Sequence, residues 1–320
     1  MHRDGSIFRR NSGFLRMYRI ANRDETRLEP MTLCMPTNCH PDRETCRRHL
    51  PGRMMQIYSL KLAKIPLEVR SVQLYGYIAV RDERDSLLNY IVNHSRDAPI
   101  TLQQGSFIEM TGPKRGISMF CDVLFEFDMR IKKGEREEDD LQLMDGMIVY
   151  DELSYIGIPF TNRINGDCGA VDITLALVPK AVEATIEVVI SEVQSGFNLS
   201  LSSFVFINKL YQQIKHFNGT IGESHVLRRF VVAVVMDTWM HLVFKVSQNG
   251  SKNIVERYCS FKVNIHGCAD QQIVHEVAAI SVKRKNERRY RTLDLDDEDG
   301  VRKFKGVLIA EVALGLTLGC

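Results

Sequence analysis

The sequence lacks a strong charge of either sign. Its 42 lysines and arginines nearly balance 40 aspartates and glutamates, which leaves a net charge of +2 over 320 residues. Dedicated nucleic-acid-binding proteins usually carry a marked basic excess, so this balance argues against that class. With only 21 glycines and 9 prolines, the chain is also unlike low-complexity or collagen-like sequences. The composition is typical of a globular protein.

The sequence also has no obvious targeting or membrane-spanning segment. No apolar stretch of signal-peptide length follows the early arginines. The longest apolar run, residues 306–319, contains Glu311 and is shorter than the ~20 residues that cross a bilayer. We therefore expect a cytoplasmic protein, with the nucleus as the alternative compartment and no membrane partner.

Familiar catalytic motifs are missing as well. The sequence contains no GxSxG, HExxH, CxxC, Walker A or GxGxxG pattern. His275-Glu276 begins like a zinc-protease helix, but Ala279 occupies the place of the second histidine. This favours a non-enzymatic role and leaves an enzyme of unrecognised type as an alternative.

The chain divides into three zones of different charge. Residues 1–53 hold 11 basic and 6 acidic residues with poor apolar periodicity, which predicts a mostly disordered basic leader. Residues 54–282 hold 22 basic and 27 acidic residues and are predicted to be the folded domain. Residues 283–320 join the basic run KRKNERRYR to an acidic run and an apolar tail. The basic run is compatible with a nuclear-import signal, a nucleic-acid arm or a solvated tail.

The folded zone shows apolar residues at every second position. In residues 124–132, LFEFDMRIK, four apolar side chains fall on one face and four charged ones on the other. Residues 182–191 and 197–202 repeat this alternation, which is typical of half-buried strands. Turn signals such as Lys133-Gly134 separate the segments. Because no long segment has helical periodicity, we predict an all-β antiparallel sandwich or open barrel of many short strands.

Two segments carry more specific expectations. Residues 230–236, FVVAVVM, are apolar throughout, which predicts a strand covered on both faces. Residues 242–246 alternate again after a turn near Asp237, so the two segments are expected to pair as a hairpin. Residues 210–216 are compatible with one or two turns of helix.

The candidate ligand-binding residues are charged groups near predicted strand ends. Two pairs place opposite charges side by side, and a third pair puts two cations in the turn GPKRG. The functional interpretation is an anion contact or a catalytic carboxylate, and the structural one is ion pairing or turn capping. A pocket that collected several of these side chains would favour an enzyme. The six residues are Arg81, Asp82, Arg96, Asp97, Lys114 and Arg115.

Cysteines concentrate in the leader. There, Cys-x4-Cys-x6-Cys-x2-His offers four soft ligands, the number that Zn²⁺ prefers. The spacing does not match a strong zinc-finger pattern, so chance cysteines in a flexible leader are the alternative, and no other cofactor is expected. The candidate metal ligands are Cys34, Cys39, Cys46 and His49.

Several stretches resemble a domain of unknown function from grasses. The clearest is residues 72–100, VQLYGYIAVRDERDSLLNYIVNHSRDAPI, and residues 124–146 and 181–201 add to it. The resemblance covers roughly residues 54–282 and implies an all-β fold. That domain occurs alone or fused downstream of the ribosome-inactivating domain of jasmonate-induced proteins. The rRNA N-glycosylase activity belongs to the fused domain and is not transferred, because the nearest string, residues 183–186, lacks the required arginine.

These observations lead to three functional hypotheses. The first is a non-enzymatic intracellular module that binds a protein or small-molecule ligand in plant stress or defence. The second is an RNA- or ribosome-associated regulator of translation, supported by the basic leader, the basic tail run and the fusion partner. The acidic balance of residues 54–282 opposes it. The third is an enzyme of unrecognised type.

Overall fold

The protein is described by a computed structural model that covers residues 18, 20, 22–28, 51–66, 69–151, 157–248, 253–264 and 267–286. These residues form eighteen strands and one short 3-10 turn, η1 (Glu137–Asp139). All paired strands run antiparallel, and the sheets that they form remain open. The predicted all-β fold is confirmed. Over this part of the chain there is no helix with the length and apolar character needed to cross a membrane.

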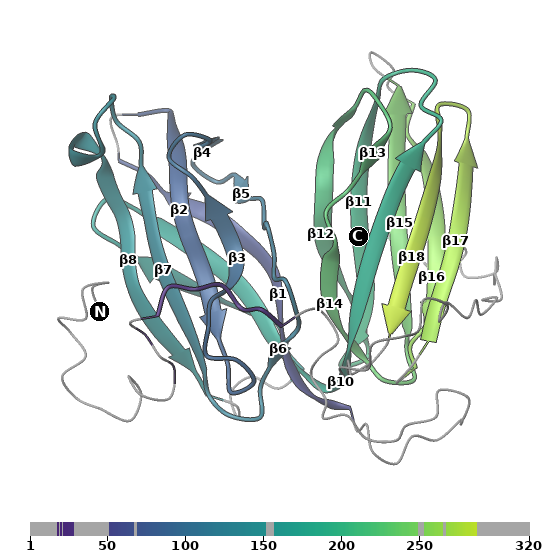
Figure 1. Cartoon of the computed structure of the whole chain (residues 1–320), viewed down its shortest axis with the longest axis horizontal. Coiled ribbons are helices and arrows are strands. Elements are labelled where there is room, and N and C mark those ends of the chain that lie inside the picture. The colour runs from purple at the N-terminus through teal and green to yellow at the C-terminus, as the bar shows by residue number, and fades with distance from the viewer. Residues whose placement is uncertain are drawn as a thin grey trace, which may run out of the picture.

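The strands make three sheets that pack as two sandwiches, here called the first and second lobes (Figure 1). In the first lobe, a sheet ordered β3-β2-β7-β8, with β4 beside β2, faces β1, β5, β6, β9 and the start of β10. The bounds are β1 (Gly52–Lys64), β2 (Ser71–Arg81), β3 (Asn89–His94), β4 (Ile100–Gln103), β5 (Phe107–Ile108), β6 (Ile117–Ser118), β7 (Val123–Ile131), β8 (Leu141–Tyr150) and β9 (Phe160–Asn165).

In the second lobe, the sheet β12-β11-β15-β16 faces the end of β10 with β13, β14, β17 and β18. Each lobe has its own apolar core, which contains Phe125 and Ile173 in the first lobe and Ile186 and Phe244 in the second. The bounds are β10 (Ala170–Ser191), β11 (Phe197–Ile207), β12 (Leu210–Ile221), β13 (His225–Val226), β14 (Phe230–Val235), β15 (Trp239–Gln248), β16 (Val255–Lys262), β17 (Gly267–His275) and β18 (Ala278–Asn286).

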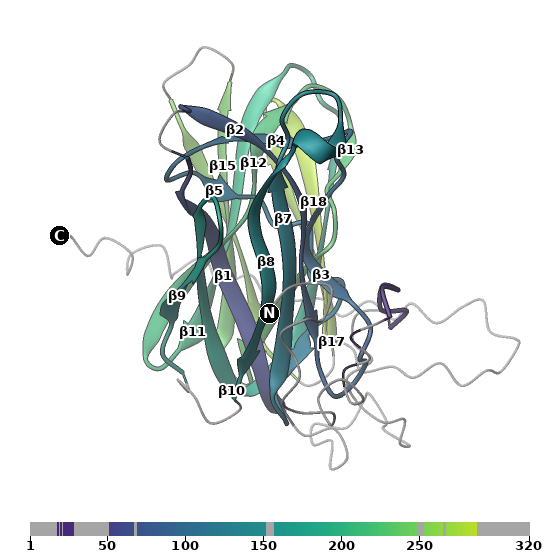
Figure 2. The same ribbon diagram turned by 90° about the vertical axis from the view of Figure 1, so that its left-hand side faces the viewer.

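The long strand β10 belongs to both lobes. Its first half pairs with β1 and β9, which lie beside it in Figure 2, and its second half pairs with β14 and β18. The register shifts where Val178 pairs with Met54 and Ala181 pairs with Gly52. Lys180 lies in this shift with a φ of 47°, which is the geometry of a bulge that redirects a strand. The bulge therefore marks the passage from one lobe to the other.

Two buried side chains tie the lobes together beside β10. Gln56 of β1 accepts a 2.8 Å hydrogen bond at Oε1 from the backbone N–H of Ala233 in β14. Glu183 of β10 accepts a 2.8 Å hydrogen bond at Oε2 from the N–H of Gly116, in the turn before β6. Both side chains are buried, so water cannot readily replace these bonds. They fix the angle at which the lobes meet.

The outer face of β7 differs from the sequence expectation. Phe125 and Phe127 face the core as predicted, but the alternate residues Glu126 and Asp128 are buried too. Part of the cover over this sheet comes from residues 22–28, which exchange backbone hydrogen bonds with Leu88. Glu126 and Asp128 on the charged face of β7 therefore lie inside the protein, whereas Arg130 on the same face stays partly exposed. That residues 1–53 form a mostly disordered leader remains a prediction.

The expected hairpin between residues 230–236 and 242–246 is wrong. β14 is buried on both faces as predicted, but it pairs with β10, whereas β15 pairs with β11 and β16 in the opposite sheet. Asp237, with a φ of 63°, turns the chain from one sheet of the sandwich into the other.

The suggested helical turns at residues 210–216 are also wrong, because this segment is part of β12. Asn208 and Lys209 both have positive φ and join β11 to β12 as a two-residue hairpin loop. Positive φ at both loop positions is the geometry that matches the twist of paired strands.

We predict that Gln56→Leu lowers the stability of the full chain by about 1–3 kcal/mol, because the buried N–H of Ala233 loses its acceptor. Urea unfolding followed by circular dichroism measures the change. Gln104→Leu, at an exposed loop position, is the control and should leave the midpoint nearly unchanged. Equal midpoints for the two variants would show that this bond does not brace the lobes.

Candidate functional site

Two arginines with no exposed surface lie at the base of the first lobe. Arg81 donates from Nε to Glu126 Oε2 at 2.9 Å, from Nη1 to the Ser86 carbonyl at 2.6 Å and from Nη2 to the Asn22 carbonyl at 2.7 Å. Every nitrogen of this guanidinium is engaged. The Asn22 bond also anchors the N-terminal segment over the sheet.

Arg115 makes the second buried pair. Its two terminal nitrogens donate to the two carboxylate oxygens of Asp82 at 2.7 and 2.8 Å, the bidentate fork that Arg and carboxylates favour. Burial alone would lower the pKa of Arg115, but the charge and hydrogen bonds of Asp82 outweigh it and raise the pKa above its usual value. Asp82 also accepts from the backbone N–H of Ser118 at 2.9 Å.

The structure thus brings together three of the six predicted site residues, Arg81, Asp82 and Arg115, inside the protein. Each is paired and has almost no exposed surface, so the cluster is an internal brace. Their proposed role in ligand binding stays a prediction.

Arg96 and Asp97 lie apart from this cluster. Arg96 donates to both carboxylate oxygens of Asp140, at 2.7 and 3.2 Å, and Tyr75 donates its hydroxyl to the same group at 2.6 Å. The hydrogen bond from Arg96 is the main reason that the pKa of Asp140 is well below its usual value. Asp97 is exposed in the turn after β3. The ion pair between Arg96 and Asp140 braces the loop that carries η1.

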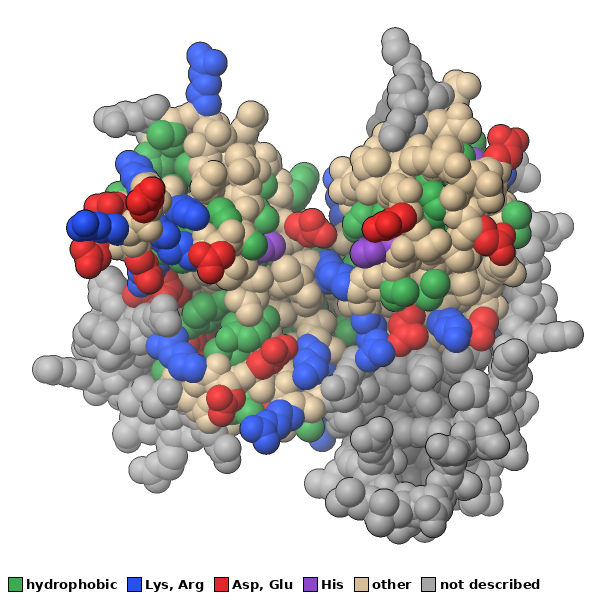
Figure 3. Space-filling view, turned by 45° about the horizontal axis from the view of Figure 1, so that its top comes forward, with side chains coloured by type: hydrophobic (Ala, Val, Ile, Leu, Met, Phe, Trp, Pro, Cys, Tyr) green, Lys and Arg blue, Asp and Glu red, His purple; other side chains and the backbone are tan. Residues whose placement is uncertain are grey.

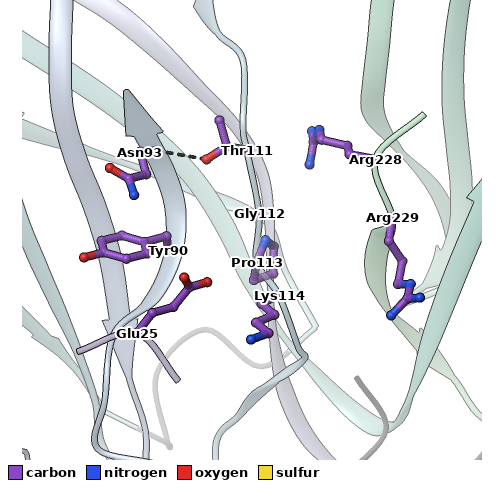
Figure 4. Close-up of a pocket in the computed structure, with 9 residues that line it drawn as sticks. All are labelled: Glu25, Tyr90, Asn93, Thr111, Gly112, Pro113, Lys114, Arg228 and Arg229. Atoms are coloured by element: carbon purple, nitrogen blue, oxygen red, sulfur yellow. Dashed lines mark hydrogen bonds between the residues drawn. The ribbon is translucent and has the colours of Figure 1, made fainter. Parts of the chain in front are cut away.

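Lys114, the sixth predicted residue, lines a groove of about 470 Å³ between the lobes. Figure 3 shows the surface hollowed between them, and Figure 4 shows the groove itself. The first lobe supplies β3 and the loop between β5 and β6, and the second supplies the segment between β13 and β14. The lining residues are Glu25, Tyr90, Asn93, Thr111, Gly112, Pro113, Lys114, Arg228 and Arg229.

The first-lobe wall is shaped by a tight contact at Gly112. A Cβ atom there would lie 1.9 Å from the carbonyl oxygen of Tyr90, so only glycine fits. Asn89 holds the following residues, because its side chain accepts from the Lys114 N–H and donates to the Arg115 carbonyl, both at 2.9 Å. As a result Lys114 faces the groove while Arg115 turns inward to Asp82.

The second-lobe wall carries two adjacent arginines in different environments. Arg229 forms a 2.8 Å ion pair with Glu187 of β10. Arg228 lies over the ring of Phe230, 4.7 Å from its centroid, and donates a long 3.4 Å hydrogen bond to the carbonyl of His216. Burial lowers the pKa of Arg228, and the more distant charge of Glu109 opposes that shift only in part.

His216 lies behind Arg228 in the second-lobe core. Its Nε2 is 2.8 Å from Ser203 Oγ, and its ring packs on Phe230. Burial, with a smaller effect of the charge on Arg228, lowers the pKa of His216 to about 3. The imidazole is therefore neutral at physiological pH and does not repel the guanidinium.

The proposed zinc ligands Cys34, Cys39, Cys46 and His49 lie outside the described residues. Within the described ranges, no three His, Cys, Asp or Glu residues come close enough together to hold a metal ion.

Most residues of the groove could not be predicted from the sequence. Arg228 and Arg229 precede an apolar strand and look like an ordinary basic pair, and Tyr90, Asn93 and Thr111 form no motif with them. The available signal was the turn 112–116, which contains Lys114, a residue that lines the groove.

We predict that Arg115→Met destabilises the protein by roughly 3–5 kcal/mol, because the buried carboxylate of Asp82 would lose the guanidinium that pairs with it. Arg163→Met removes an equally short bidentate pair, with Asp172, but Arg163 is largely exposed, so the loss of stability should be much smaller. Comparing the two unfolding free energies tests the brace. Similar small losses would show that Asp82 does not depend on Arg115.

We also predict that His216 makes the protein less stable in acid. The unfolded chain protonates this imidazole below about pH 6.5, whereas the folded protein resists protonation until about pH 3. Stability should therefore fall by about 1.4 kcal/mol per pH unit across this window from His216 alone. His216→Gln, which cannot titrate, should flatten the unfolding free energy against pH by that amount. An unchanged slope would contradict a buried neutral histidine.

Comparison with known proteins gives a family and little more. No curated protein matches the chain. Solved structures of human GIVD cytosolic phospholipase A2, alone and in complex with methyl gamma-linolenyl fluorophosphonate, match at 10% and 8% identity, both with a TM-score of 0.23. The matches cover 72% and 74% of this chain but 32% of each of those chains, and so low a score supports no argument. Residues 54–283 match a domain of unknown function, DUF6598, and the chain belongs to that family.

Proposed function

We propose that this protein is a non-enzymatic binding module and that its ligand, a protein segment or a small molecule, binds in the groove between the lobes. The observation that carries this proposal is the construction of the groove. Its walls come from both lobes, whose mutual angle is set by β10 and by the buried bonds of Gln56 and Glu183. A preformed groove of this kind binds a ligand without a large ordering cost.

The side chains in the groove are suited to recognition. Tyr90 offers an aromatic face, Asn93 an amide, Thr111 a hydroxyl, and Lys114 and Arg228 positive charges. Of the two carboxylates among the predicted site residues, Asp82 is buried in an ion pair, and Asp97 is exposed outside the groove. The arrangement therefore supports binding over chemistry.

The biological setting is proposed from the sequence resemblance. Residues 72–100 resemble a grass domain that also occurs fused to the ribosome-inactivating domain of jasmonate-induced proteins. On that basis we place the protein in plant stress or defence, in the cytoplasm or nucleus. This part of the proposal is an analogy of family and does not come from the groove.

A second candidate function is an association with RNA or the ribosome. It is favoured by three cations, Lys114, Arg228 and Arg229, that line one groove. The excess of acidic residues in the folded zone opposes it, since 22 basic residues face 27 acidic ones over residues 54–282. RNA binding at the groove would weaken steeply as salt is raised.

We predict that Asn93→Trp blocks ligand capture by the full-length protein. Asn93 is exposed on β3. Its hydrogen bond to Thr111 is made by the backbone N–H and not by the side chain, so a larger side chain can fill the groove without breaking that bond. Gln104→Trp, at an exposed loop position outside the groove, is the matched control. Immobilised proteins would be exposed to extract of stressed plant tissue, and the retained proteins, RNA and small molecules identified by mass spectrometry and sequencing.

The expected result is a set of molecules retained by wild type and Gln104→Trp and depleted roughly tenfold or more by Asn93→Trp. Equal retention by both tryptophan variants would remove the groove from the proposal. Retained RNA that is released steeply by salt would favour the second candidate function. Turnover of a substrate in a broad hydrolase screen, lost in Asn93→Trp, would replace binding by catalysis.

A further inference from the structure

We infer that the groove contains a subsite for an oxyanion group of the ligand, a phosphate or a carboxylate, and that the guanidinium of Arg228 holds it. This inference rests on the proposed function, because it assigns the chemistry of one part of the same groove. It identifies a residue that no sequence motif pointed to and a chemical class for the ligand.

Arg228 differs from three other arginines of the fold in its pairing. Arg81 and Arg115 are buried, and each has a carboxylate within 2.9 Å. Arg229, next to Arg228 in the chain, is more exposed and still pairs with Glu187. Over the described part of the chain, Arg228 is half-buried and has no carboxylate oxygen within 4.0 Å. No described carboxylate pairs with this guanidinium, so it is able to bind an anionic group of a ligand.

The guanidinium of Arg228 is held in place by two contacts within the protein. The ring of Phe230 supports one face of the guanidinium, and the carbonyl of His216 accepts one long hydrogen bond. A guanidinium has five N–H donors, so most of them are left for a ligand. In Figure 4 the guanidinium extends into the groove toward Thr111 and Asn93, whereas Arg229 is directed elsewhere.

The partial burial of Arg228 also makes the binding of an anion energetically favourable. A guanidinium that has lost part of its hydration is unfavourable unless an anion compensates it, which is why burial lowers the pKa of Arg228. An arriving oxyanion would restore that lost interaction and form hydrogen bonds with the guanidinium. Charge-assisted bonds of this type are among the strongest available to a protein side chain.

The surrounding groups complete a site for one anionic group. Thr111 Oγ1 accepts from the Asn93 N–H at 2.9 Å, which leaves its hydroxyl hydrogen for a ligand. Lys114 donates to the Thr26 carbonyl at 3.1 Å and lines the same groove, where its positive charge stands beside the negative charge of Glu25. A volume of about 470 Å³ is within the range of small-molecule sites, so the anionic group belongs to a molecule of modest size or to one protruding residue.

The test is a titration of the full-length protein with two probes, inorganic pyrophosphate and citrate, at constant ionic strength. Two-dimensional amide NMR would follow Thr111 and Arg228. We expect saturable shifts at these residues with at least one probe. Arg228→Gln should weaken that binding by at least about tenfold, and the matched control Arg229→Gln by only a few-fold. Arg228→Lys, which keeps the charge but loses the fork, should lie between them.

A gain of affinity provides an independent readout. Glu109 acts electrostatically on Arg228 without contacting it, so Glu109→Gln should tighten anion binding by a few-fold. A purely structural role for Arg228 would not produce this gain. If Arg228→Gln fails to fold, phenylglyoxal labelling of the wild-type protein replaces it. The probe should then protect Arg228 from modification and leave the exposed Arg163 reactive.

The outcomes separate this inference from the proposed function. Binding of pyrophosphate alone assigns a phosphate, and binding of citrate alone assigns a carboxylate. No saturable binding of either probe, or equal binding by Arg228→Gln and Arg229→Gln, would overturn the subsite. If Asn93→Trp still abolishes ligand capture in that case, the groove remains the binding site and only its anion chemistry is wrong.

Discussion

The rest of the structure depends on the pairing of β10, one continuous strand that is shared by two cores. Its 22 residues bond to β1 and β9 in the first lobe and to β14 and β18 in the second. Neither core can form its large sheet without it. Because the groove takes one wall from each lobe, its shape is set by the bulge at Lys180 and by the bonds of Gln56 and Glu183. The shape of the groove and the stability of the fold therefore depend on the same residues.

The arginine in the groove differs from the buried arginines in how its positive charge is paired. Arg81 and Arg115 are satisfied by internal carboxylates and act as braces, whereas Arg228 is only half-buried and supported by a ring and a carbonyl. Pairing removes a cation from further chemistry, and incomplete pairing leaves it able to bind. By this criterion, the groove wall near Arg228 suits the anion proposed above.

The sequence predicted what depends on local pattern and missed what depends on distant contacts. Alternation at residues 124–132 and 182–191 correctly gave strands, because one face of each lies on a core. The same alternation suggested that Glu126 faces water, but residues far away in the chain cover it. The predicted hairpin between β14 and β15 was wrong because two segments adjacent in the chain can enter opposite sheets. Tertiary packing determines which sheet each segment joins. The groove was missed because its walls come from separate parts of the chain.

The turn that was singled out from the sequence shows how function and structure divide between neighbouring residues. Gly112 allows close approach to Tyr90, and Asn89 holds the next two backbone groups, so successive side chains point in opposite directions. Lys114 then adds charge to the groove, and Arg115 neutralises Asp82 inside the fold. Since one short loop carries both roles, a substitution that loosens its backbone would weaken the brace and the binding wall together. Separating the two requires side-chain changes in the groove, away from the loop backbone, for which Arg228 and Asn93 are placed.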